Sequence, residues 1–478
     1  MQSSIFNVRV PLPARDEVFL MNTFTDAQLV VSSDVAALLD RMAPESATSE
    51  ETLNDEELGI AAELADHGFL VENRQGEREA LNAYFSRFRE DTSELRVTVL
   101  TTLQCNFACD YCFQGDHGDY NKFAAKMSLE TAGAVARWIE DRLDETGAKG
   151  FVLTFFGGEP LLNLPAMYEL AERAWHASQV RGVELRISII TNGLLLTPQV
   201  VDRLLPFGLK GVKVTLDGDR DTHNRMRPLR GGQGTFDRIV ENVRRVADKV
   251  AISIGGNFDA SSVDSYPALL DFLLEQEFAD KLAKVAFKPI IRQGTPVPAA
   301  QPAKGAIPLT AVGTNGKPLG GTCMTAAGSG SSVCDTCHFV DEKLSFLREE
   351  TQKRGFKTID GVHMGPCEIH KRHAYTIGPD GALYACPGFT GEKGLSVGHI
   401  ERRQESWQAS AARKFDALAA WKQCGDCSYI PVCAGGCSVA SQTELGDMNT
   451  PTCHKSSFDS ALVALAHKSA SQLMETVQ

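Results

Sequence analysis

Apolar and polar residues alternate along residues 95–290 in a way that predicts strands separated by helices. Six apolar runs, rich in β-branched and aromatic residues, end at turn residues as strands do. Amphipathic stretches lie between them, which favours parallel pairing through right-handed crossovers. The predicted strands are 95–101, 151–155, 185–190, 212–216, 250–254 and 285–289. The predicted helices are 128–145, 164–178, 198–204, 235–247 and 264–277.

This alternation predicts the fold class. It indicates an α/β fold in which residues 95–290 form a partial (β/α)6 barrel, TIM-like but with six units instead of eight. An open doubly wound sheet is the alternative. In both folds, ligands bind at the carboxyl ends of the strands. Residues that directly follow the predicted strands are therefore the candidates for a functional site.

The chain on either side of the barrel divides into further units. Residues 1–80 combine short apolar runs with two helical patterns, which predicts a small winged-helix-like module. Residues 291–366 begin with a stretch rich in Gly, Pro and Ala, which predicts an insert or bridging region with one helix at 341–353. Residues 367–457 are rich in Cys and predict a separate domain, and 458–478 predict a C-terminal helix.

Charge and hydropathy exclude several classes of protein. The 478 residues include 48 basic and 61 acidic side chains, a net charge of −13, which argues against nonspecific binding to nucleic acid. No apolar run approaches the ~18–20 residues that cross a bilayer, and the N-terminus lacks the pattern of a secretory signal. We therefore expect a cytoplasmic protein without a nucleic-acid or membrane partner.

Cysteine usage points to metal chemistry. The chain has 13 cysteines, an odd number, and they are clustered. Without a secretory signal a disulfide framework is unexpected, and clustered thiols in such a chain more often bind metal or iron–sulfur centres.

Three cysteines directly follow the first predicted strand. Cys105, Cys109 and Cys112 can wrap one face of a compact cluster. A [4Fe–4S] cluster usually takes four thiolates, so three would leave one iron open for a ligand that is not protein. A zinc ion is the alternative, and it would need a fourth ligand such as His117.

Each of the next three predicted strands ends in a short polar segment. Glycines allow close approach of the backbone, a carboxylate pairs with an ammonium group, and an arginine fork suits a carboxylate. Each segment alone is a weak signal, but together at successive strand ends they are specific. The residues are Gly157, Gly158 and Glu159, then Asn192, then Thr215, Asp217 and Arg227.

The cysteine spacing, with an aromatic residue before the third cysteine, and these strand ends resemble the radical S-adenosylmethionine (SAM) superfamily. The resemblance covers roughly residues 95–290. It implies that the three cysteines bind a [4Fe–4S] cluster, which cleaves SAM to give a 5′-deoxyadenosyl radical. It implies that the edge ending in Glu159 binds the amino group of SAM, and that Thr215 and Arg227 hold its ribose and carboxylate.

A second group of cysteines lies in the last third of the chain. Its spacing resembles the SPASM domain, the auxiliary-cluster domain of many peptide-modifying radical SAM enzymes. The resemblance implies two further [4Fe–4S] clusters, whereas spacing alone leaves a zinc ribbon as an alternative. The implied ligands are Cys367, Cys386 and Cys437 for one cluster, and Cys424, Cys427, Cys433 and Cys453 for the other.

One auxiliary cluster lacks a fourth cysteine in this pattern. Cys323, Cys334 or Cys337 can supply it, although the closely spaced pair Cys334 and Cys337 lies further upstream of Cys367 than the family's extra ligand usually does. The competing interpretation is an open iron that a substrate thiolate occupies. We favour the upstream pair.

The resemblance implies a peptide-modifying enzyme. We expect oxidative crosslinking, as a thioether or carbon–carbon bond, on a peptide or small protein with a leader segment, and an external flavodoxin- or ferredoxin-like electron donor. Thioether-forming maturases, including those of quinohemoprotein amine dehydrogenase, fit the layout best. Sulfatase maturation ranks lower because Cys386 is followed by Pro387 and not by Asp. A non-enzymatic electron carrier or a zinc-based interaction protein is the alternative from another class.

Overall fold

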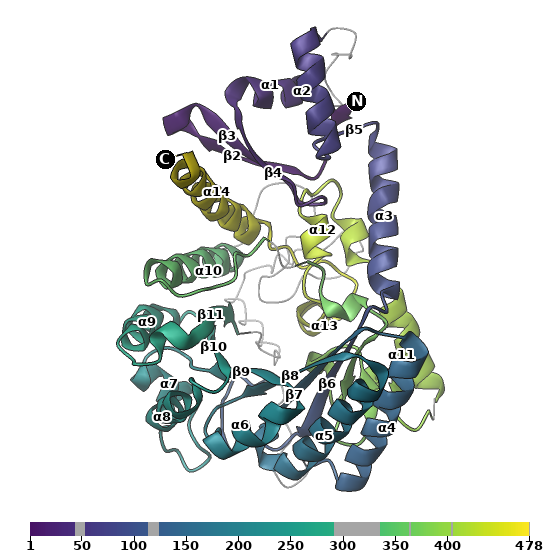
Figure 1. Ribbon diagram of the computed structural model, residues 1–478, viewed down its shortest axis with the longest axis vertical. Helices are drawn as coiled ribbons and strands as arrows, with labels where there is room; N and C mark the ends of the chain where they lie inside the picture. Colours follow the sequence, from purple (N-terminus) through teal and green to yellow (C-terminus); the bar gives the residue numbers. More distant parts are fainter. Residues whose placement is uncertain (44–52, 113–123, 291–334, 363–364, 403–404, 478) are drawn as a thin grey trace, which may run out of the picture.

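The computed structural model contains an α/β core, and the N-terminal unit and the C-terminal helix lie next to each other on one side of it (Figure 1). No helix in the described part of the chain is long and apolar enough to cross a membrane. The Gly/Pro-rich stretch predicted as an insert lies outside the described residues. The structure describes residues 1–43, 53–112, 124–290, 335–362, 365–402 and 405–477.

A nine-stranded sheet forms the centre of the molecule, in the order β11-β10-β9-β8-β7-β6-β12-β13-β14. Its first six strands are parallel, and they confirm the predicted strands. Their order follows the chain without reversal, whereas a doubly wound sheet reverses at a switch point. The partial barrel therefore describes these strands and the doubly wound alternative does not. They are β6 (Glu94–Thr102), β7 (Gly150–Gly157), β8 (Glu184–Thr191), β9 (Leu209–Thr215), β10 (Ala251–Phe258) and β11 (Leu282–Pro289).

The helices between these strands cover one face of the sheet. On β7, Phe151, Leu153 and Phe155 are fully buried against them, while the intervening residues face the inside of the partial barrel. All five predicted helices are present, and a sixth was missed because it is short and polar. They are α4 (Leu129–Thr146), α5 (Leu164–Arg181), α6 (Pro198–Leu204), α8 (Phe236–Val246) and α9 (Tyr266–Leu274), with α7 (Arg220–Met226) as the missed helix.

Local signals define the ends of these helices. α4 begins where the Ser128 side chain accepts a hydrogen bond from Thr131 N, and it ends at Gly147, whose φ of 61° is the left-handed conformation that glycine favours. α8 carries Ile239, Val240 and Val243 on one buried face, as an amphipathic helix does.

The Cys-rich region continues the central sheet. β12 (Ala374–Ile377) pairs in parallel with β6, and β13 (Ala382–Tyr384) and β14 (Gly398–His399) extend the sheet in antiparallel fashion. The sheet therefore crosses the boundary predicted at residue 367. The remaining helices of this region are α11 (Ser406–Asp416), α12 (Ile430–Cys433), α13 (Ser438–Leu445) and α14 (Lys455–Val477).

The helix predicted at 341–353, in the bridging region, is longer than expected. α10 (Asp335–Lys353) begins before the expected residue 341, and it packs between β11 and α14 (Figure 1).

The N-terminal unit is a three-stranded antiparallel sheet covered on both faces. Val18 and Leu20 of its central strand pack toward α1 and α2, whereas Phe19 and Met21 pack toward α14. The short strands and the two helical patterns predicted here are confirmed, and the winged-helix-like interpretation stays a prediction. The elements are β1 (Gln2–Ser3), β2 (Asn7–Leu12), β3 (Glu17–Asn22), β4 (Gln28–Ser32), α1 (Ser33–Arg41), α2 (Asp55–Asp66), β5 (Leu70–Val71) and the connecting α3 (Arg74–Glu90).

Candidate active site

The loop after β6 presents three thiols at the carboxyl end of the sheet. Cys105 is buried, Cys109 and Cys112 are half-buried, and no disulfide joins any of the ten cysteines that the structure describes. Burial raises the pKa of Cys105 to about 12 and that of Cys109 to about 11. Both thiols therefore keep their protons at neutral pH until a metal centre displaces them.

This loop is clamped by the segment that follows α7. Ala108 N–H donates to Pro228 O at 2.9 Å, and Phe107 forms an antiparallel bridge with Leu229. The guanidinium of Arg227 lies over the Phe107 ring, 5.6 Å from its centroid. The cysteine loop and the predicted SAM-binding arginine are thus held as one unit.

Gly157 and Gly158 bring the end of β7 against the start of the same loop. Gly158 N–H donates to Thr102 O at 3.0 Å. A Cβ would lie 2.2 Å from Thr102 O at Gly157, and 2.3 Å from Gln104 O at Gly158. Both clashes are with backbone, so only glycine fits. The glycines therefore fix the loop just before Cys105, a role that sequence reasoning did not foresee.

Glu159 lies fully buried beneath the site. Its Oε1 accepts hydrogen bonds from Leu161 N–H at 3.0 Å and from the Thr191 hydroxyl at 2.7 Å, and its Oε2 accepts one from Asn192 N–H at 2.8 Å. Burial raises the pKa of this carboxyl group. Both oxygens are engaged within the protein, so Glu159 ties β7 to the end of β8. Direct pairing of Glu159 with SAM stays a prediction.

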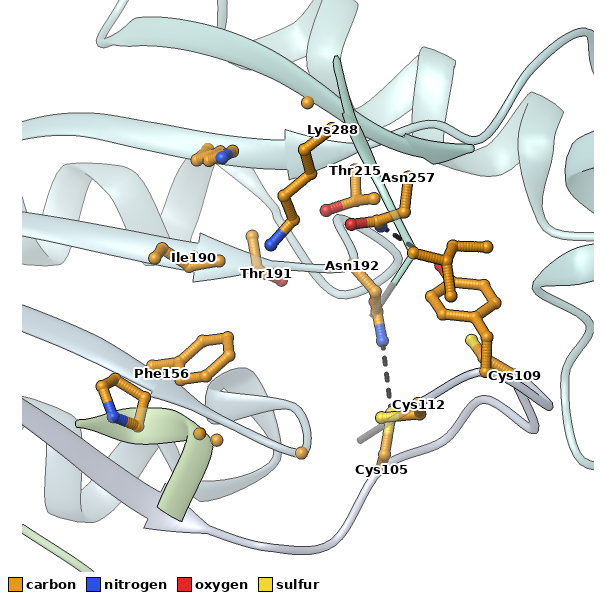
Figure 2. A pocket seen from close by; sticks show the side chains of 18 of the residues that line it. Cys105, Cys109, Cys112, Phe156, Ile190, Thr191, Asn192, Thr215, Asn257 and Lys288 are labelled. Atoms are coloured by element: carbon orange, nitrogen blue, oxygen red, sulfur yellow. Dashed lines mark hydrogen bonds between the residues drawn. The ribbon is translucent and has the colours of Figure 1, made fainter. Parts of the chain in front are cut away.

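Asn192 links Glu159 to Cys105, the first cysteine of the loop. Its Nδ2 donates to Asn106 Oδ1 at 2.8 Å and lies 3.9 Å from Cys105 Sγ (Figure 2). The carboxylate of Glu159 therefore positions an amide donor beside a candidate cluster ligand.

Asp217 joins the fourth strand end to the cysteine loop. Its Oδ1 accepts from Asn257 N–H at 2.7 Å, and its Oδ2 accepts from the Tyr111 hydroxyl and lies 3.5 Å from Arg227 Nη1. Arg227 Nη1 also donates to the Tyr111 oxygen at 2.5 Å. A buried carboxylate thus holds the arginine that sequence reasoning assigned to SAM.

His223 supports the same network from behind. Its Nδ1 accepts from Asp217 N–H at 3.1 Å, and its Nε2 lies 3.0 Å from the Thr235 hydroxyl, which itself donates to Arg227 O. Burial lowers the pKa of His223 well below its usual value, and the charge of Arg227 lowers it further. The network requires a neutral imidazole with its proton on Nε2.

A cavity of about 420 Å³ connects these elements (Figure 2). The three cysteines of the loop line it, as do Cys386 and Cys437 of the Cys-rich region. Two distinct thiol groups therefore face one space. The remaining predicted site residues that line it are Gly157, Gly158, Asn192, Thr215 and Arg227.

The seven cysteines of the C-terminal region fall into two electrostatic groups. Burial is the largest cause of the raised pKa of Cys367, Cys386, Cys424, Cys427 and Cys433, which reaches about 12 for Cys386, and the other thiols of the same group raise these pKa values further. The groups are Cys367, Cys386 and Cys437, and Cys424, Cys427, Cys433 and Cys453. These are the sets that the sequence resemblance implies, and their ligand role stays a prediction.

Three cysteines upstream of Cys367 are the predicted candidates for the missing auxiliary ligand. Cys323 and Cys334 lie outside the described residues, and Cys337 lies on the first turns of α10, where the structure describes the backbone only. Their part in an auxiliary site stays a prediction.

Several residues of the site were missed from the sequence. Tyr111 and Asn257 belong to the Asp217 network, and Lys213 and Lys288 line the cavity. Lys213 could have been found, since it lies two residues before Thr215 on a strand and so faces the same side.

The donor set of the cysteine loop fits an iron–sulfur cluster better than a single ion. Among the described residues, no three His, Cys, Asp or Glu side chains are placed to hold one metal ion. A four-iron cluster binds each thiolate to a separate iron and needs a shared space between them. Cys105, Cys109 and Cys112 face such a space in the cavity.

The residues beside the cysteine loop also fit SAM. Arg227 Nε is buried and has no hydrogen-bond partner in the part of the chain that the structure describes. An unused donor on a buried guanidinium at the cavity wall suits a carboxylate such as that of SAM.

Known proteins share the central part of the chain. Residues 99–256 match the radical SAM superfamily. The Fe-coproporphyrin III synthase of Methanosarcina barkeri is 29% identical over 216 residues, 45% of this chain and 48% of that protein. The mycofactocin maturase MftC of Mycobacterium tuberculosis is 24% identical over 362 residues, 71% of this chain and 77% of that protein. The first of these matches thus covers about half of the relative's length.

A solved structure shares the fold. The anSMEcpe structure with bound AdoMet has a TM-score of 0.55 and 16% sequence identity to this chain, and the match covers 78% of this chain and 99% of that chain. At this identity the likeness concerns the fold.

Gly158→Ala tests the backbone contact that fixes the cysteine loop. We expect a loss of ~1–3 kcal/mol in the free energy of unfolding and a lower iron content after reconstitution, because the new Cβ meets Gln104 O. Denaturant unfolding and iron analysis measure both. Gly59→Ala, on an exposed turn of α2 with nothing within 4 Å, is the control. Unchanged stability and iron in Gly158→Ala would contradict the assignment.

Arg227→Lys tests the guanidinium beside the cavity. The lysine keeps the charge next to buried Asp217 but lacks the planar fork, so we expect the affinity for SAM to fall at least about tenfold. Equilibrium binding of SAM to reconstituted protein measures this. Arg225→Lys, an exposed change on α7, is the matched control. Equal affinities in the two variants would show that Arg227 is not a SAM ligand.

Proposed function

Because residues 99–256 match the radical SAM superfamily, we propose that the chain is a radical SAM enzyme that modifies a peptide or a small protein. The observation that carries the proposal is the cavity shared by two thiol groups. Cys105, Cys109 and Cys112 line one side, and Cys386 and Cys437 belong to the other group.

The residues of the barrel prepare the cavity for the cofactors. When bound, SAM and a [4Fe–4S] cluster supply a one-electron cleavage that yields a radical able to remove a hydrogen atom from a substrate carbon. Arg227 offers its unused Nε–H to the carboxylate of SAM, and Asp217 and Tyr111 fix that guanidinium. Thr215 lines the cavity and would hold the ribose of SAM. These contacts preorganise the site before substrate enters.

The second thiol group favours an oxidative outcome. A crosslink between a thiol and a carbon removes two electrons and two protons from the substrate. One electron leaves with the hydrogen atom that the radical takes, and the other needs an acceptor nearby. Cys386 and Cys437 would hold an auxiliary cluster as that acceptor at the wall of the same cavity. An external flavodoxin- or ferredoxin-like protein would supply the electron that starts each turnover.

A peptide substrate is supported by the N-terminal unit and by the relatives. β4 (Gln28–Ser32) is an edge strand of its sheet among the described strands, and an extended leader segment can add to such an edge. One solved structure of similar fold, with a TM-score of 0.55, carries AdoMet and the Cp18Cys peptide, and one relative is a maturase. We therefore place a leader segment on β4 and the modified residues in the cavity.

The alternatives predict different products. Sulfatase-type maturation would convert a substrate cysteine to an aldehyde, whereas a crosslink would leave the peptide lighter by two hydrogens. Mass spectrometry of a short cysteine-containing peptide co-expressed with the chain distinguishes them.

Iron and sulfide analysis tests the cluster assignment. After anaerobic reconstitution we expect about twelve iron and twelve sulfide per chain. Replacing Cys105, Cys109 and Cys112 together by Ala should remove about four of each and abolish cleavage of SAM to 5′-deoxyadenosine. Asp110→Asn, an exposed change in the same loop, is the control.

Two results would reject this function. Stoichiometric zinc without iron, in protein made with ample iron, would favour a zinc-based interaction protein. Full iron content without SAM cleavage in the unaltered chain would favour an electron carrier.

Single Cys→Ala variants test the missing auxiliary ligand. If Cys334 or Cys337 supplies it, replacing that residue should perturb one auxiliary cluster and lower substrate conversion, while SAM cleavage without substrate survives. Iron analysis and electron paramagnetic resonance measure the clusters, with Cys323→Ala as the comparison. Full cluster content in all three variants would instead support an open iron that binds a substrate thiolate.

A further inference from the structure

Two lysines line the cavity without an acidic partner. Lys213 comes from β9 and Lys288 from β11, and Figure 2 shows Lys288 extending into the cavity. The described residues that line the cavity include three cations, these lysines and Arg227, and no carboxylate. Arg227 is paired with Asp217 just behind the wall, whereas no ion pair within the described part of the chain involves either lysine.

The strand between the two lysines leaves room for them. β10 lies between β9 and β11, and it carries Gly255 where a side chain would obstruct Lys213. A Cβ at Gly255 would lie 2.6 Å from Lys213 Cε and 3.4 Å from its Nζ. The end of Lys213 therefore lies across β10, on the side of Lys288.

The lysines repel one another in this position. Burial lowers the pKa of Lys213, and the positive charges of Lys288 and Lys284 lower it further. Like charges held in a partly desolvated space are unfavourable unless an anion lies between them. The wall of the cavity therefore carries unbalanced positive charge, which an anionic ligand would neutralise.

The cations lie near different thiol groups. The charge of Arg227 acts on Cys109 in the cysteine loop, whereas the charge of Lys288 acts on Cys386 in the Cys-rich region. Arg227 is thus placed for the carboxylate of SAM, and Lys288 lies toward the part of the cavity beyond it.

We propose that Lys213 and Lys288 bind a carboxylate of the substrate, the side chain of an Asp or Glu in the modified peptide. The inference rests on the proposed function and adds a substrate class to it: the modified segment contains an acidic residue. Lysine suits this role because its ammonium group is a flexible point charge that adapts to different positions of the carboxylate.

Two blocked amino acids test the proposal in reconstituted, SAM-loaded protein. N-acetyl-L-glutamate N-methylamide carries the carboxylate, and N-acetyl-L-glutamine N-methylamide replaces it with a neutral amide of similar shape. We expect the glutamate probe to bind at least about tenfold more tightly, measured by ligand-observed NMR titration. Lys213→Met and Lys288→Met should each remove the preference, and Lys288→Arg should retain it. Lys210→Met, an exposed change at the start of β9 that lies off the cavity, is the matched control.

Three results would overturn the proposal. The first is equal binding of the two probes by the unaltered chain, or a preference that survives both Met variants. The second is a loss of SAM affinity in the Met variants that decarboxylated SAM does not show, because the lysines would then serve the SAM carboxylate. The third is an altered midpoint potential of an auxiliary cluster with no change in probe preference, because the lysines would then only balance the charge of the cluster.

The experiments distinguish failure of the lysine site from failure of the proposed function. Absence of SAM cleavage by the unaltered chain rejects the radical SAM activity. Normal SAM cleavage together with no carboxylate preference rejects the lysine site alone.

Discussion

The site depends on one close backbone contact, between the end of β7 and the loop that follows β6. Gly158 N–H and Glu159 N–H donate to Thr102 O and Gln104 O, and neither glycine at this point has room for a Cβ. This contact sets the position of Cys105 at the start of its loop. It also directs the side chain of Glu159 into the interior, where it reaches the end of β8. One backbone approach therefore places a candidate cluster ligand and orders the neighbouring strand.

Two buried carboxylates hold the ends of neighbouring strands together. Glu159 joins β7 to β8, and Asp217 joins β9 to β10 and to Tyr111 in the cysteine loop. Both carboxylates are fully buried, and a buried carboxylate that lacked hydrogen-bond partners would destabilise the fold. Both carboxylates are engaged within the protein, and among the described residues that line the cavity the charged side chains are all cations.

The sequence predicted the strands and the cysteine loop well because these depend on local pattern. The period of the apolar runs gives the six parallel strands, and the cysteine spacing gives the loop. It did not show that Glu159 faces inward, because that depends on where the end of β8 lies. It did not show that β12, a four-residue strand after a long insert, pairs with β6, since that pairing is a long-range event. Lys213 was visible by alternation with Thr215, but only Gly255 on the neighbouring strand explains its course.

The pairing of β12 with β6 has a consequence for the chemistry. Cys386 follows β13, which pairs with β12, and β12 pairs with β6, which leads to Cys105. The two thiol groups are therefore connected through hydrogen-bonded strands of one sheet, and not across a linker between domains. Strand pairing spaces neighbours by about 4.8 Å and resists sliding, since a slip of one residue would turn buried side chains outward. The sheet thus sets the separation of the two thiol groups, and a ligand that occupied the cavity would be positioned by its own contacts with the wall.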